Sequence, residues 1–139
     1  MLFLIFEIGE VGYALAADGI IEILPSVAAR KIRGAAPEVA GFISYRGQYL
    51  PVVDVSQLEL GRPAARRMGT RIVVVEAQAS KRNGLLGVIL ESATDTLRCE
   101  PEDFRPVAVG PRGLVQRLDL ETLLPLRVRD AVLHEEAAR

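Results

Sequence analysis

Residues 41–58 read Gly41-Phe-Ile-Ser-Tyr-Arg-Gly-Gln-Tyr-Leu-Pro-Val-Val-Asp-Val-Ser-Gln-Leu58 and carry the local signals that decide the fold. Two short apolar runs, 42–45 and 49–53, have the length and composition of β-strands. Between them lies Arg46-Gly47-Gln48, whose glycine can take the positive φ that a tight hairpin requires. Asp54 then precedes Val55, where its carboxylate can cap the first turn of a helix. The stretch predicts a β-hairpin that leads into a short capped helix.

Segments of the same kind occur along the whole chain. Most are short, rich in Val, Ile and Leu, and bounded by Gly, Pro, Asn or Asp. Their short connections favour antiparallel pairing and leave no room for βαβ crossovers. Helical signals are limited to the turn after Asp54, a second turn over 119–124 and a C-terminal segment over 128–139. We expect strands at residues 2–8, 13–16, 42–45, 49–53, 71–77, 85–90, 96–99 and 114–118.

A weak internal repeat links the two parts of the chain. The pattern Asp-x-x-x-Glu-x-Leu at 18–24 recurs as Glu-x-x-x-Asp-x-Leu at 91–97, and the Arg-Gly hairpin before Asp54 recurs before Asp119. Closing each unit into a small barrel and packing the pair would leave no open sheet edge. We therefore predict an all-β fold in one domain over 1–139, with pseudo-repeat halves at about 1–60 and 70–125 and a connection at 62–69.

The composition restricts the classes of partner. The chain has 139 residues, a formal net charge of -1 and a pI near 5.9, so no overall field attracts it to nucleic acid or anionic lipid. Half of the residues are hydrophobic but only 5% are aromatic, which predicts an aliphatic core. No apolar run approaches the roughly 20 residues of a membrane helix. We expect a cytoplasmic protein without membrane insertion.

The residues that carry enzyme chemistry are few. Cys99 is the only cysteine and His134 the only histidine, which leaves neither a disulfide nor a histidine–cysteine metal set. Asp54 and Asp119 both precede short helical turns, so capping is a better explanation for them than a two-carboxylate mechanism. We expect no enzymatic activity, no cofactor and no metal.

Two basic clusters supply the alternative function. One contains Arg30, Lys31 and Arg33, and the other contains four arginines between 62 and 71. Small β-barrels do bind nucleic acid, but no aromatic residues that could stack on bases are interleaved with these clusters. A nucleic-acid-binding small β-barrel is therefore the alternative, and solvated loop charge is the simpler interpretation.

Longer motifs resemble one family. Ile20-Ile-Glu-Ile23 is followed by Ala36-Pro37-x-Val39-x-Gly41-x-Ile43-x-x-Arg46-Gly47-x-x-Leu50-Pro51-Val52-Val53-Asp54. Gly87-Val-Ile-Leu-Glu91, Asp95-Thr-Leu97 and Glu102-Asp-Phe-Arg105-Pro106 follow in the second half. Together these motifs resemble the CheW-like family of chemotaxis adaptors over nearly the whole chain. Residues 44–48 and 60–67 are similar to adaptors of Wsp-type systems, which serve surface sensing.

The resemblance implies a pair of five-stranded β-barrels with an apolar seam between them. It implies a non-enzymatic adaptor that couples a chemoreceptor-type sensor to a CheA-type histidine kinase. The implied partners are the cytoplasmic tip of the receptor and the regulatory domain of the kinase, and the implied location is the receptor array in the cytoplasm.

The resemblance also implies the contact residues. Positions that match Glu22 and Arg46 are associated with receptor contact in the family, and the apolar or small positions near the same seam match Ile20, Gly41, Leu86 and Val88. Without the family, Glu22 and Arg46 would be read as ordinary exposed charges.

One departure concerns the second barrel. Family members usually carry a strand with an aromatic-x-Gly pattern between the Arg-Pro motif and the last helical turn. Here only residues 107–111 separate Pro106 from the second Arg-Gly hairpin. We expect the second barrel to be either incomplete or closed by a tighter hairpin.

Overall fold

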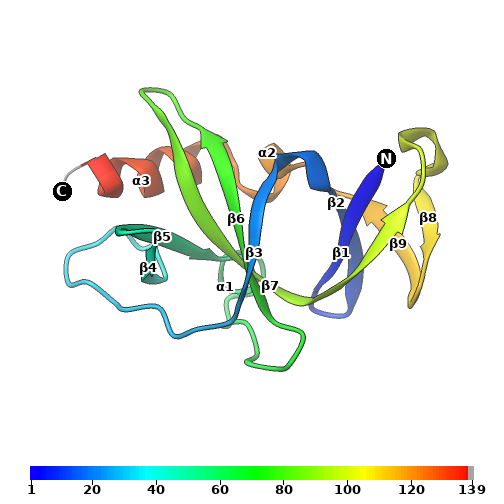
Figure 1. Cartoon of the computed structure of the whole chain (residues 1–139), viewed down its shortest axis with the longest axis horizontal. Helices are drawn as coiled ribbons and strands as arrows, with labels where there is room; N and C mark the ends of the chain where they lie inside the picture. The colour runs from blue at the N-terminus through cyan, green and yellow to red at the C-terminus, as the bar shows by residue number, and fades with distance from the viewer. Residues whose placement is uncertain (138–139) are drawn as a thin grey trace.

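The computed structural model describes residues 1–137, in which β-strands predominate (Figure 1). The last two residues of the predicted C-terminal segment, 138–139, lie outside the described residues. The elements in chain order are β1 (Leu2–Ile8), β2 (Val11–Ala16), η1 (Ala17–Gly19), β3 (Ile20–Pro25), β4 (Gly41–Tyr45), β5 (Gln48–Asp54), α1 (Val55–Leu60), β6 (Arg71–Gln78), β7 (Asn83–Arg98), η2 (Pro101–Asp103), β8 (Val107–Gly110), β9 (Gly113–Arg117), α2 (Leu120–Leu123) and α3 (Leu126–Ala137).

The hairpin predicted from residues 41–58 is confirmed. β4 and β5 pair antiparallel, with Tyr45 opposite Gln48. The turn consists of Arg46 and Gly47, whose φ angles are +49° and +81°. Positive φ at both turn residues matches the right-handed twist of the flanking strands, which is why two-residue hairpins favour it. α1 follows β5 directly, as predicted.

The strands form one nine-stranded sheet in which β7 is shared by two five-stranded halves. The first half contains β3, β6, the beginning of β7, β5 and β4. The second contains the end of β7, followed by β1, β2, β9 and β8. β7 crosses from one half to the other in Figure 1. The all-β prediction is confirmed, with two barrel-like halves that are not closed by strand pairing within residues 1–137.

These spatial halves do not coincide with the predicted sequence halves at 1–60 and 70–125. β1 and β2 pair with the end of β7 and with β9, whereas β6 and the beginning of β7 pair with β3 and β5. Each spatial half therefore contains one hairpin from the other sequence half, β6–β7 in the first and β1–β2 in the second. The duplication itself stays a prediction, and residues 61–70 are the connection between α1 and β6.

Three details differ from the sequence prediction. Two pairings, β2 with β9 and β5 with β7, are parallel, which the long connections between these strands permit. The segments 85–90 and 96–99 belong to the single strand β7, which passes through Ser92 at a φ of +52°. β3 and β8 were not predicted, and both are edge strands. With the tight hairpin β8–β9, the second half still has five strands.

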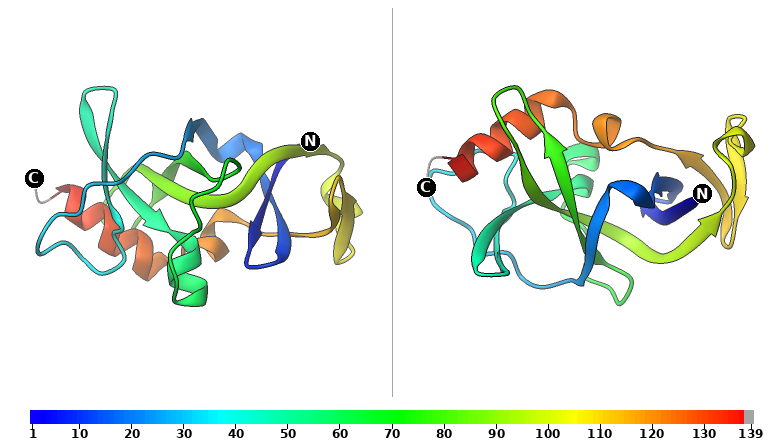
Figure 2. Two further views of the ribbon diagram at one scale, coloured as in Figure 1. Left: turned by 90° about the horizontal axis from the view of Figure 1, so that it is seen from below. Right: turned by 45° about the horizontal axis from the view of Figure 1, so that its top comes forward.

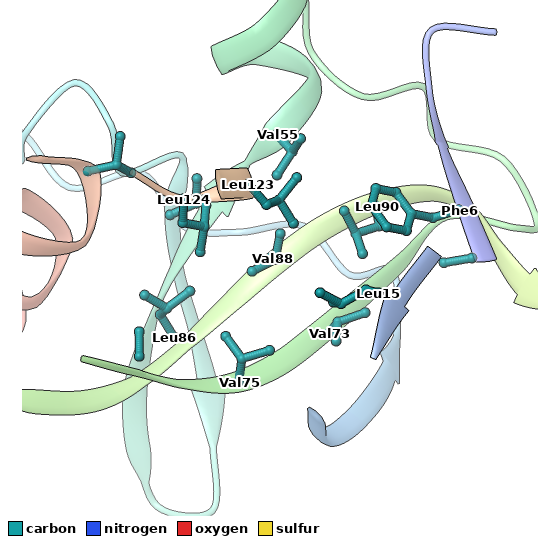
Figure 3. Close-up of a cluster of buried hydrophobic side chains, with 14 of the residues drawn as sticks. Phe6, Leu15, Val55, Val73, Val75, Leu86, Val88, Leu90, Leu123 and Leu124 are labelled. Atoms are coloured by element: carbon teal, nitrogen blue, oxygen red, sulfur yellow. The ribbon is translucent and has the colours of Figure 1, made fainter. Parts of the chain in front are cut away.

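The main core lies where the two halves meet. Phe6 and Leu15 from the second half approach β6 and β7 (Figure 3). The cluster is closed by Leu123, the last residue of α2, and by Leu124, which follows it. α3 adds Val128, Val132 and Leu133, all of them buried. Figure 2 shows α3 lying along the first half. The helix therefore completes the core that β6 and β7 begin. Most of this core is aliphatic, as the composition predicts.

Candidate functional site

A cluster of Glu22, Tyr45 and Arg46 occupies the tip of the β4–β5 hairpin. Glu22 lies on the edge strand β3, and the other two residues lie at the hairpin turn. Oε1 of Glu22 accepts a hydrogen bond from the Tyr45 hydroxyl at 2.7 Å and from Nη2 of Arg46 at 2.9 Å. The structure therefore brings together the two charged residues that the resemblance selected, and it adds a phenol.

The cluster is polar and open to solvent. The Arg46 side chain is 72% exposed, and its guanidinium carbon lies 5.3 Å from the centre of the Tyr45 ring, within cation–π range. The hydrogen bond to the Glu22 carboxylate raises the pKa of the Tyr45 hydroxyl, because ionisation would remove the donated proton. At neutral pH the phenol is therefore a donor, and the guanidinium keeps most of its surface available.

Apolar residues adjoin Glu22 along β3, where successive side chains point to opposite faces of the sheet. Ile21 and Ile23 are exposed on either side of Glu22, and Ile20 is half-buried against the main core. The sequence prediction included Ile20 but missed Ile21 and Ile23. A signal was present, because three isoleucines around one glutamate in a short segment are typical of a strand with a partly apolar surface.

Leu86 and Val88 are not part of an exposed surface. Their side chains are 0% and 1% exposed and belong to the main core. Neither can touch a partner without unfolding of β7, so their assignment as contact residues is wrong for the folded chain. Both lie on β7 opposite β6, with Leu86 paired to Val75, which is also the partner of Ile20. They lie on β7, which pairs with β6, and β6 in turn pairs with β3.

Gly41 is buried and is required for a close approach. A Cβ atom built there would lie 2.8 Å from the Ala29 Cβ and 2.9 Å from the Arg30 carbonyl oxygen. The segment after β3 crosses Gly41 at this point, where Arg30 and Phe42 exchange two backbone hydrogen bonds of 2.8 Å. Gly41 therefore lies at the opposite end of β4 from the Glu22 cluster.

The two aspartates predicted as helix caps differ. Asp54 is 9% exposed, and its Oδ1 accepts from the Gln57 amide at 3.2 Å, as an N-cap does. Its Oδ2 accepts from the Ala64 amide at 2.9 Å. Asp119 also precedes a helix, but its side chain makes no cap bond and pairs with Arg117 Nε at 3.2 Å. Asp54 is a structural carboxylate that joins α1 to the following loop.

The remaining candidates for chemistry are dispersed. His134 is exposed on α3, and Cys99 is half-buried at the far end of β7, where burial raises the pKa of its thiol. Within residues 1–137 no three His, Cys, Asp or Glu side chains are grouped in a way that could hold a metal ion. Over the same residues, no helix has the length and apolar character needed to span a bilayer.

The fold is that of a known scaffold. The crystal structure of the scaffolding protein TtCheW from Thermoanaerobacter tengcongensis matches with a TM-score of 0.72, covering 93% of this chain and 90% of that one at 17% identity. The sequence pattern of the CheW-like domain matches residues 2–124. The chain belongs to the CheW-like domain family.

One curated relative supports the same family. The chemotaxis protein CheW of Rhizobium meliloti (strain 1021) is 30% identical over 101 residues, which cover 73% of this chain. The matched region spans 63% of that relative's length. The helix α3, over Leu126–Ala137, begins beyond the end of the family match at residue 124.

Proposed function

We propose that this chain is a non-enzymatic adaptor that couples a chemoreceptor-type sensor to a CheA-type histidine kinase. Its partners are the cytoplasmic tip of the receptor and the regulatory domain of the kinase, and it acts in the cytoplasm at receptor arrays. The observation that carries the proposal is the exposed cluster of Glu22, Tyr45 and Arg46 on a fold of the CheW-like family. The finer assignment to a Wsp-type surface-sensing pathway rests on the resemblance of residues 44–48 and 60–67.

The mechanism needs surfaces of fixed geometry instead of reactive groups. β3 is an edge strand, so its outer backbone groups and the exposed Ile21 and Ile23 are available to a partner. The neighbouring Glu22 and Arg46 provide charges of both signs, which fix the orientation of a partner and increase the rate of association. We place the receptor contact on this edge strand and the adjoining hairpin tip, with Ile20 as a supporting position, whereas the buried Gly41 lies at the other end of β4.

The test must separate a contact role from an ion pair that acts only within the chain. Charge reversal at either position, by Glu22→Lys or Arg46→Glu, should weaken binding to a receptor-tip fragment by at least about tenfold, or about 1.4 kcal/mol. The exchanged pair Glu22→Arg with Arg46→Glu restores the internal attraction but reverses each charge toward the partner. We expect it to bind as weakly as the single variants.

Arg127→Glu is the matched control. Arg127 is 73% exposed and forms an ion pair with Glu38 at 3.3 Å, away from the proposed surface. This variant should bind the receptor fragment like the wild type. Titrations by calorimetry, with circular dichroism as a check of folding, give the comparison. If the exchanged pair binds like the wild type, Glu22 and Arg46 act only on each other and the proposed surface is wrong.

A further inference from the structure

The fold brings one residue of each basic cluster, Lys31 and Arg66, to the lining of one cavity. The cavity has a volume of about 560 Å³ and lies between segments 26–40 and 61–70, with Lys31 on one side and Arg66 on the other. No Asp or Glu occurs between residues 23 and 37 or between residues 60 and 75. Both loops lie along the lower edge of the molecule in Figure 1. Lys31 and Arg66 therefore give the cavity a basic rim, with no carboxylate near either of them along the chain.

The interior of the cavity is mostly apolar. Its walls include Val27, Ile32, Val39, Pro63 and Ile89. The carboxylate of Asp54 also faces it, with both oxygens already bonded to backbone amides. A second anion placed beside this buried carboxylate would be repelled. A ligand that fits must therefore insert an apolar group and keep its negative charges at the rim.

The outer surface of the rim has the same mixed character. The Met68 side chain is 94% exposed at the loop that carries Arg66 and Arg67, and the Ile32 side chain is exposed next to Lys31. Large apolar side chains exposed beside cations match a partner that offers apolar and acidic side chains alternately. No Phe, Tyr or Trp is among the residues of the described chain that line the cavity, so base stacking has no platform there.

Backbone and side-chain hydrogen bonds hold both loops in place. In the second loop, the Thr70 hydroxyl donates to the Ala65 carbonyl at 2.6 Å and accepts from the Arg67 amide at 3.2 Å. In the first, the Ala40 amide donates to the Val52 carbonyl at 2.8 Å. These bonds order part of each loop before a ligand arrives, which lowers the cost of ordering on binding.

We propose that this cavity binds an acidic peptide segment of a partner protein, with an apolar side chain between the loops and carboxylates on Lys31 and Arg66. The cavity includes Gly41, whereas the Glu22 cluster adjoins Tyr45 at the other end of β4. Four steps of about 3.3 Å separate Gly41 from Tyr45 along β4, which is roughly 13 Å. The cavity is a second surface, and its function does not depend on the receptor contact proposed above.

The probe is a displayed library of random twelve-residue peptides, selected on the immobilised full chain. We expect the selected peptides to combine Asp or Glu with Leu, Ile, Phe or Met. A fluorescent copy of the strongest peptide should bind Arg66→Glu and Lys31→Glu at least tenfold more weakly than the wild type. Met68→Ser should weaken binding severalfold, and a Gln-for-Glu copy of the peptide should also bind more weakly.

Arg98→Glu is the matched control, because it makes the same charge change at an exposed arginine on the second half of β7. It should change the affinity less than twofold. The proposal is overturned if no acidic-apolar peptides are enriched, or if Arg98→Glu weakens binding as much as Arg66→Glu. It is also overturned if a single-stranded oligonucleotide binds the wild type and displaces the peptide, because the site would then recognise nucleic acid.

Discussion

Asp54 offers the sharpest test of the local energetics. Its two carboxylate oxygens accept from two backbone amides, Gln57 at 3.2 Å and Ala64 at 2.9 Å, in a site that is 9% exposed. Removing an N-cap side chain costs about 0.5–2 kcal/mol, and a second hydrogen bond contributes about 1 kcal/mol net. Asp54→Ala should therefore lower the free energy of unfolding by about 1.5–3 kcal/mol.

Asp54→Asn separates this double role from simple capping. Asn and Asp are about equally good N-caps, so a residue that only caps α1 would tolerate the change. Here Asn keeps one acceptor oxygen and turns its NH2 group toward the second amide. One hydrogen bond is lost, and the NH2 group of Asn faces a backbone N–H that is also a donor. Together these changes should lower the free energy of unfolding by about 1–2 kcal/mol.

Urea unfolding followed by circular dichroism measures these differences, provided the slope with urea is unchanged. Asp119→Asn is the control, because Asp119 precedes α2 without capping it and pairs only at the surface. Its effect should stay below about 0.5 kcal/mol. The loss in Asp54→Asn should persist at high salt, which screens the helix dipole but not a hydrogen bond. If the Asp54→Asn variant is as stable as the wild type, the hydrogen bond from the Ala64 amide to Asp54 does not contribute to stability.

Two further predictions concern the β6–β7 hairpin and the middle of the sheet. Asp130 accepts from the backbone and hydroxyl of Ser80 at 2.7 and 2.8 Å, and these bonds lower its pKa. The stabilisation is therefore complete above the unfolded pKa of about 3.9 and is lost as the pH falls through the lower folded value. Urea titrations from neutral to acidic pH should show that Ser80→Ala loses its stability deficit in acid; a deficit independent of pH would contradict this. Gly87→Ala would place a Cβ 2.9 Å from the Ile72 Cγ2 atom and should cost about 1–3 kcal/mol. Gly19→Ala meets nothing within 4 Å and should be nearly neutral in the same urea experiment, and equal effects of the two would disprove the overpacking argument.

Local signals in the sequence predicted the local structure well. The Arg46-Gly47 turn, the helix after Asp54 and the aliphatic core all depend on residues that are adjacent in the chain or on overall composition. Pairings between distant strands were not predictable in this way. The parallel pairs and the exchange of hairpins between the two halves depend on which distant strands meet, and hydrophobic alternation does not encode that.

The candidate site was predictable only in part. The resemblance selected Glu22 and Arg46, and the structure places Nη2 of Arg46 2.9 Å from Oε1 of Glu22. It also selected Leu86 and Val88, which are core residues, because an apolar residue in a strand looks the same whether it faces a seam or a core. The cavity shared by the two basic loops is not predictable from the sequence, because residues 26–40 and 61–70 are separated along the chain and only the fold brings them together.

An adaptor must hold its two partners at the same time, so a bridging experiment decides whether this chain is one. A receptor-tip fragment is immobilised, and the regulatory domain of a CheA-type kinase is passed over it with and without this chain. We expect the kinase domain to be retained only in the presence of the chain, in proportion to the amount of chain bound. Arg46→Glu should lower this retention at least about tenfold at sub-saturating concentration, and Arg127→Glu should leave it unchanged. If the chain binds only one of the two partners, or neither, it is not an adaptor between them.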